Sequence, residues 1–180
     1  MLFSQDYFEL FDIPRGFEID LEKLADQYRI LQRQLHPDRY VNASDQDRRL
    51  SVQKTAFVNE AFQTLKSPLL RARYLLTLKG IEFDDEKETH FDPTFLMEQM
   101  ELRESLSEIR SDDDASLALI RLMDDILRRK KAMEAELASA LNAEGKDQLQ
   151  EAKQIVQKMQ FLVRLQQEAE ELEEELLEAY

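Results

Sequence analysis

Glycine and proline, the two residues that most often interrupt helices, are scarce in this chain. Its 180 residues include only three glycines and four prolines. None of them lies inside the stretches in which apolar residues recur every three or four positions. Because both residues mark turns and loops, so few of them favour long helices joined by few turns. The sequence therefore predicts an all-α fold.

The first half of the chain predicts a helical hairpin. Asp20 is an expected N-cap, and the amphipathic stretch that follows it should end before Pro37, because the residue preceding a proline is pushed out of the α region. A second amphipathic stretch covers residues 57–65, so two helices flank an exposed connection at about residues 36–43. We expect these helices to pack antiparallel, and residues 69–79 to form a further short helix.

The second half predicts a bundle of three amphipathic helices. Its expected helices cover about residues 93–110, 114–142 and 146–178. The last has more than 30 residues at about 1.5 Å each, so an elongated or L-shaped molecule is expected. The predicted parts are an all-α N-terminal unit at 1–80, a packed acidic connector at 81–92 and a three-helix domain at 93–180.

The net charge of −14 is unevenly distributed. Residues 1–80 carry 12 Lys and Arg against 11 Asp and Glu, whereas residues 81–180 carry 12 against 27. Because an acidic chain is repelled by phosphate groups, nucleic acid and anionic membranes are disfavoured as partners of the whole molecule. Cationic proteins remain possible partners.

Cysteine is absent, which excludes disulfides, zinc–thiolate sites and cysteine-ligated iron–sulfur clusters within this sequence. We expect no metal site and no cofactor. The first residues lack the positive charge and the apolar core of a signal peptide, and no stretch has the roughly 18 apolar residues of a membrane span. A cytoplasmic location is therefore expected.

The tripeptide His36-Pro37-Asp38 lies in the predicted hairpin connection. Asp38 could orient His36 as a general base, but the surrounding residues offer no nucleophile, and we expect no catalytic residue. The alternative is structural, since Pro37 ends a helix and Asp38 favours a local turn.

Three arginines surround this tripeptide. Arg29 and Arg33 lie off the apolar stripe of the preceding helix, and Arg39 follows the tripeptide. Compensation of the helix dipole, at about 0.3–1 kcal/mol for each charge, explains the first two but not Arg39. The sequence thus predicts a cationic edge, formed by Arg29, Arg33 and Arg39, on an acidic protein.

The stretch from Phe95 to Ile109 carries two apolar faces. At about 100° per residue, Phe95, Leu102, Leu106 and Ile109 share one stripe, which is expected to face the core. The opposite side holds three apolar and three acidic residues: Leu96, Met97, Met100, Glu101, Glu104 and Glu108. This second face either packs on another part of the protein or binds a partner.

Several motifs resemble those of a known family. A helix with Tyr28 and Arg29, then His36-Pro37-Asp38, then a helix with Asn59-Glu-Ala-Phe-Gln-Thr-Leu65, resembles the J domain of DnaJ-type co-chaperones. Three further stretches resemble the HscB family, the J proteins of iron–sulfur cluster assembly: Tyr7-Phe-Glu-Leu-Phe11, Ser67-Pro-Leu-Leu-Arg-Ala-Arg-Tyr-Leu-Leu76 and Phe95-Leu-Met-Glu-Gln-Met-Glu-Leu-Arg-Glu104.

The resemblance implies a co-chaperone that stimulates the ATPase of a partner and is not itself an enzyme. The implied chaperone-binding residues, for a DnaK-class chaperone of the HscA type, are Tyr28, Arg29, Arg33, His36, Pro37, Asp38 and Arg39. Asp38 would act there as a polar contact and not as a base. Ala25 and Asp26 stand where other J domains carry basic residues, which favours a dedicated HscA-type partner.

The resemblance also implies a site for an IscU-type iron–sulfur scaffold. Its residues would be Leu96, Met97, Met100, Glu101, Glu104, Glu108 and Phe161. Phe161 has an alternative role in the core, beside Leu165. Two alternatives for the whole protein are a J protein with a different client and a structural helical adaptor.

Overall fold

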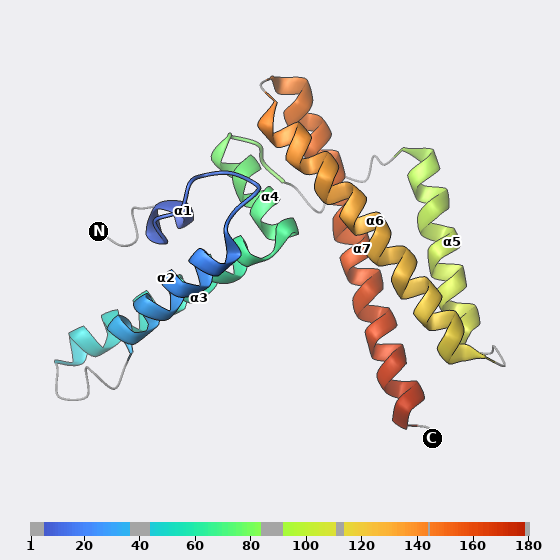
Figure 1. Cartoon of the computed structure of the whole chain (residues 1–180), viewed down its shortest axis with the longest axis horizontal. Helices are drawn as coiled ribbons and strands as arrows, with labels where there is room; N and C mark the ends of the chain where they lie inside the picture. Colours follow the sequence, from blue (N-terminus) through green and yellow to red (C-terminus); the bar gives the residue numbers. More distant parts are fainter. Residues whose placement is uncertain (1–5, 37–43, 84–91, 111–113, 144, 179–180) are drawn as a thin grey trace. The chain divides into compact units, whose positions relative to one another are not determined.

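The computed structural model describes residues 6–36, 44–83, 92–110, 114–143 and 145–178 (Figure 1). Every regular element within these residues is a helix, which confirms the predicted all-α fold. The chain divides into two compact units, Met1–Leu78 and Lys79–Tyr180.

Four helices build the first unit: α1 (Tyr7–Leu10), α2 (Leu21–Leu35), α3 (Asp45–Lys66) and α4 (Pro68–Leu78). The Asp20 side chain accepts hydrogen bonds from the backbone N–H groups of Glu22 and Lys23, which confirms it as the N-cap of α2. Helix α3 begins twelve residues before the apolar stretch that predicts it, because Ser44 caps its first turn by accepting from the Asp47 N–H at 3.2 Å.

Helices α2 and α3 form the predicted antiparallel hairpin (Figure 1). Ser51, early in α3, donates to the Leu35 carbonyl at the end of α2, with 2.8 Å between oxygens. Tyr28, in the middle of α2, donates to Asn59 Oδ1, further along α3, at 3.0 Å. An early residue of α3 thus contacts the end of α2, and a later residue of α3 contacts the middle of α2. The two helices therefore run in opposite directions.

Helix α1 is tied to α3 and α4 through Tyr7. Its ring stacks on that of Tyr74 with 4.4 Å between centroids, and its hydroxyl donates to Glu60 Oε1 at 3.1 Å. Burial, together with the hydrogen bond to the Glu60 carboxylate, raises the pKa of Tyr7 to about 12. This short helix thus closes the core of the unit, where Phe8 and Phe11 are buried.

Three helices build the second unit: α5 (Pro93–Ile109), α6 (Ala115–Asn142) and α7 (Lys146–Glu178). These bounds agree with the predicted ones to within one residue. All three helices contribute to a common core, which contains Phe95 from α5, Ile126 from α6 and Leu165 from α7. Of the predicted connector, residues 84–91 lie outside the described part; the ring of Phe83 lies 5.5 Å from Lys153 Nζ on α7.

Candidate functional site

The first candidate site is the outward face of α2 near its C-terminal end. Arg29, Arg33 and His36 are exposed there. Arg29 forms an ion pair with Asp26, one turn earlier, so part of the cationic charge is compensated within the helix. Pro37, Asp38 and Arg39 lie outside the described residues, so their arrangement stays a prediction.

Tyr28 belongs to the packing of the hairpin. Its ring stacks on Phe62 of α3 at 4.0 Å between centroids, and its hydroxyl donates to Asn59 and accepts from Gln32 Nε2 at 2.9 Å. Gln32 also donates to Asn59. The side chain is half-buried, and its contacts with Phe62 and Asn59 fix the register of α2 against α3. Gln32 lies one turn after Tyr28, and this spacing predicts that the two side chains lie close together.

The second candidate site is the outward face of α5, defined by Leu96, Met97 and Met100. Phe95, Leu102 and Ile109 are buried in the core, as the spacing predicts. Leu96, Met97 and Met100 keep 42%, 64% and 71% of their surface exposed. Among the described residues of the second unit, neither α6 nor α7 covers this face.

Acidic residues border this apolar face. Glu101, Glu104 and Glu108 are all exposed on α5. At about 100° per residue, they lie within about 60° of Met97. The arrangement is an adaptable apolar centre with a carboxylate rim, which suits a partner whose own surface is apolar and basic.

Phe161 occupies a different place from that predicted for a scaffold contact. Only 9% of its surface is exposed, and its ring packs edge to face with Phe95 at 6.0 Å between centroids. Arg103 lies over the same ring at 5.6 Å. The side chain belongs to the core that α5 shares with α7, so its core alternative describes its position, and it is not part of the exposed face.

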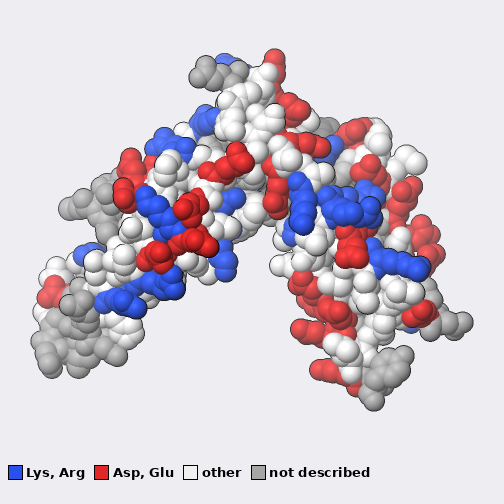
Figure 2. Space-filling model, viewed as in Figure 1, with Lys and Arg blue, Asp and Glu red and all other residues white. Residues whose placement is uncertain are grey.

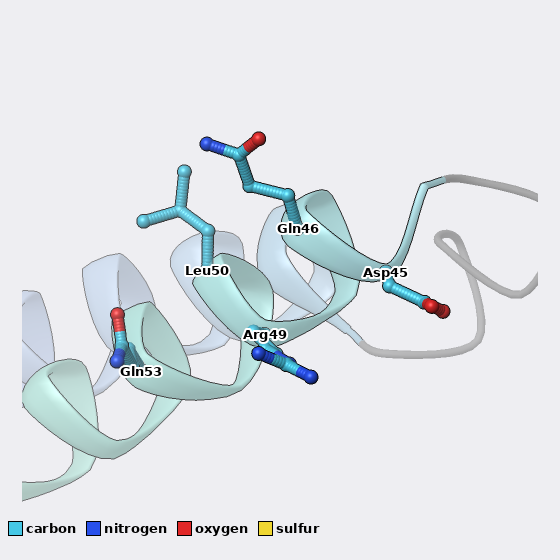
Figure 3. A pocket seen from close by; sticks show the side chains of 5 residues that line it. All are labelled: Asp45, Gln46, Arg49, Leu50 and Gln53. Carbon is cyan, nitrogen blue, oxygen red and sulfur yellow. The ribbon is translucent and has the colours of Figure 1, made fainter.

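One hollow on the described surface lies along α3. A cavity of about 550 Å³ is lined by Asp45, Gln46, Arg49, Leu50 and Gln53. Figure 3 shows that these side chains all come from one stretch of α3. Among the described residues, a single helix therefore lines this hollow, whereas ligand pockets usually enclose their ligand between several elements.

Two further properties concern the described residues alone. No group of three or more His, Asp or Glu residues in this part of the chain is arranged to hold a metal ion. Within the same residues, no helix is both long enough and apolar enough to cross a membrane.

Comparisons with known proteins cover both units. Residues 91–170 match the family described as the HSCB C-terminal oligomerisation domain. The co-chaperone protein HscB homolog of Shewanella pealeana is 48% identical over 174 residues, which span 96% of this chain and 99% of the relative. The homolog of Aliivibrio salmonicida is 44% identical over 172 residues, with 96% and 99% covered.

Solved structures agree with these relatives. Chaperone HscB from Vibrio cholerae superposes with a TM-score of 0.84 at 40% identity, covering 96% of this chain and 99% of that one. Human co-chaperone protein HscB superposes with a TM-score of 0.85 at 32% identity, covering 94% and 83%. With both its helical units matched at such identities, the chain belongs to the HscB family of co-chaperone proteins.

Proposed function

We propose that this protein acts in the cytoplasm to bring an IscU-type iron–sulfur scaffold to an HscA-type chaperone and to stimulate that chaperone's ATPase. The observation that carries the proposal is the exposed face of α5, where Leu96, Met97 and Met100 remain in solvent although the core stripe of the same helix is buried. A contiguous apolar face of this kind marks a protein interaction site.

The scaffold would bind the α5 face. Flexible methionine side chains adapt to an irregular apolar surface, and burying them supplies the affinity. The carboxylates of Glu101, Glu104 and Glu108 would steer a basic partner, so association should weaken as salt rises. Phe161 would contribute indirectly, from the core of the unit, because its contact with Phe95 holds α5 on α7.

The chaperone would bind the first unit, through the His36-Pro37-Asp38 loop and the edge formed by Arg29, Arg33 and Arg39. Tyr28 would take part by fixing α2 against α3, since its hydroxyl and ring both contact α3. In this role the loop is a recognition element, and Asp38 stabilises the hydrolysis-competent state of the partner. The second unit then raises the effective concentration of the scaffold at the chaperone.

The chaperone half of the proposal predicts that Asp38→Asn abolishes stimulation while leaving scaffold binding intact. The measurement is the steady-state ATPase rate of a purified HscA-type chaperone, with and without scaffold. Asp147→Asn, an equivalent change at an exposed position in α7, is the control and should stimulate like wild type. Undiminished stimulation by Asp38→Asn would contradict the role of the loop.

The scaffold half predicts that Leu96, Met97 and Met100 replaced together by Ala weaken scaffold binding by at least about 2 kcal/mol, or roughly 30-fold. Isothermal calorimetry measures the affinity. Leu21→Ala with Val52→Ala, which also truncates exposed apolar residues, is the control and should change nothing. If the wild type stimulates the ATPase but does not bind scaffold, the client is a different protein.

A further inference from the structure

A hollow lies next to the rim of the α5 face, between the last turns of α5 and the first turns of α6. Its volume is about 340 Å³, and its lining consists of Ser105, Glu108, Ile109, Ala118, Arg121 and Leu122. Each of the two helices, which lie side by side in Figure 1, contributes three of these residues. Because Glu108 also belongs to the carboxylate rim, the hollow is continuous with the α5 face.

The apolar residues of the α5 face are too few to form a protein interface alone. From Leu96 to Met100 they span about 6 Å along the helix. A typical stable interface buries about 800 Å² on each partner. A protein that binds the α5 face must therefore also cover the surface beside it.

The two sides of α5 offer such a partner different charges. Arg103 and Ser105 lie about 160° apart around the helix. On the side of Arg103, towards α7, the arginines already have contacts, because Arg103 lies over the Phe161 ring and Arg110 pairs with Glu175 at 3.0 Å.

Arg121, on the side towards α6, is exposed. Among the residues that the structure describes, its guanidinium group forms no ion pair and no hydrogen bond. This arginine of the hollow is therefore available to a partner.

The hollow combines an apolar floor with this positive charge. Ile109 and Leu122 are buried, and the small side chain of Ala118 leaves room above them. Leu117, one turn before Arg121, keeps 41% of its surface exposed and prolongs the apolar surface onto α6. Figure 2 shows acidic residues along α5 and basic residues over the middle of α6 beside them. The site thus suits an apolar side chain with a carboxylate next to it, which arginine can bind through two parallel hydrogen bonds.

We propose that the scaffold-binding surface extends from the α5 face across this hollow onto α6, where an apolar side chain of the scaffold enters the hollow and a neighbouring carboxylate pairs with Arg121. The inference rests on the proposed function, since the scaffold is the occupant. The hollow shares Glu108 with the rim of the scaffold site, which favours this occupant over another protein. The scaffold then meets negative charge at Glu101 and Glu104 and positive charge at Arg121, so the charges define the orientation in which it binds.

The test measures the affinity of the full-length protein for a purified IscU-type scaffold by isothermal calorimetry. Arg121→Glu should weaken binding at least about tenfold, because repulsion replaces the ion pair. Ser105→Tyr, which fills the hollow, should weaken binding to a similar extent. Arg164→Glu makes the same charge change at an exposed position of α7, and Ser139→Tyr makes the same enlargement at an exposed position further along α6. Both controls should bind like the wild type.

Circular dichroism checks that the variants stay helical. Should Arg121→Glu lose helicity, Arg121→Gln removes the charge without adding another and should still weaken binding. Wild-type affinity in Arg121→Glu or in Ser105→Tyr would overturn the extension, and so would an equal loss in Arg164→Glu, which would indicate a general effect of net charge. If truncation of the α5 face to alanine still weakens binding in that case, the proposed function stands. A wild type that does not bind the scaffold would overturn both.

Discussion

Replacing Phe161 by Ala tests whether this side chain supports the α5 face from the core. With 9% of its surface exposed, Phe161 buries nearly all of an aromatic side chain, on the order of 200 Å². Truncating a buried Phe to Ala costs about 3–5 kcal/mol, which includes the cavity left beside Phe95. For a unit of this size, that loss corresponds to a fall in Tm of about 12 °C or more.

The assay combines urea unfolding, followed by far-ultraviolet circular dichroism, with hydrogen exchange of peptides from α5 and α7. Faster exchange confined to these peptides would assign the loss to the second unit. Met100→Ala is the matched control, because this exposed side chain should change the free energy of unfolding by less than about 0.5 kcal/mol. Unfolding of Phe161→Ala at the wild-type midpoint would refute the core assignment.

Phe161→Leu distinguishes indirect support of the α5 face by Phe161 from direct contact of Phe161 with the scaffold. Leucine keeps most of the buried volume, so the variant should stay folded and bind the scaffold like the wild type. If a folded Phe161→Leu loses as much affinity as the variant with Leu96, Met97 and Met100 truncated, Phe161 touches the partner directly.

Two further predictions concern the first unit. Because the fold raises the pKa of Tyr7, the stabilisation by its neutral hydroxyl is complete below about pH 10 and disappears as the pH rises towards 12. After solvent screening, urea unfolding should show a loss of about 1 kcal/mol in the free energy of unfolding over this range. Tyr7→Phe, which has no hydroxyl to ionise, should not show this pH-dependent loss. Arg71 is buried, donates to the Leu65 carbonyl in the last turn of α3 at 2.6 Å and lies 5.1 Å from the centre of the Phe17 ring. Arg71→Met should therefore lower the free energy of unfolding by about 2–3 kcal/mol, as measured in urea. An unchanged urea midpoint would contradict this role.

Most helix boundaries could be predicted because their signals are local. Asp20 caps α2 through two neighbouring N–H groups, and α5 starts at a proline that follows the capping side chain of Asp92. The early start of α3 was missed because its first turns bury only Ser51 and carry no apolar stripe. The Ser44-to-Asp47 spacing was the local signal that could have revealed it.

The candidate sites were predictable only where a helix buries a single stripe. On α5 the buried and exposed residues separate as the periodicity predicts. Helix α7 packs against both α5 and α6, so its buried arc is wide enough to include Phe161 as well as Leu165. The bond from Tyr28 to Asn59 depends on the register between two helices, and neither sequence segment alone contains that information.

Electrostatics should contribute to the choice of partner at the α5 face. Its apolar centre is bordered by the exposed carboxylates of Glu101, Glu104 and Glu108. A basic scaffold is attracted to this border, whereas an acidic protein is repelled by it. Because exposed charges are screened by salt, replacing the three carboxylates by Gln should weaken scaffold binding at low salt and change it little at high salt. Calorimetry at two salt concentrations measures the difference, and an equal loss of affinity at both would contradict a steering role for these carboxylates.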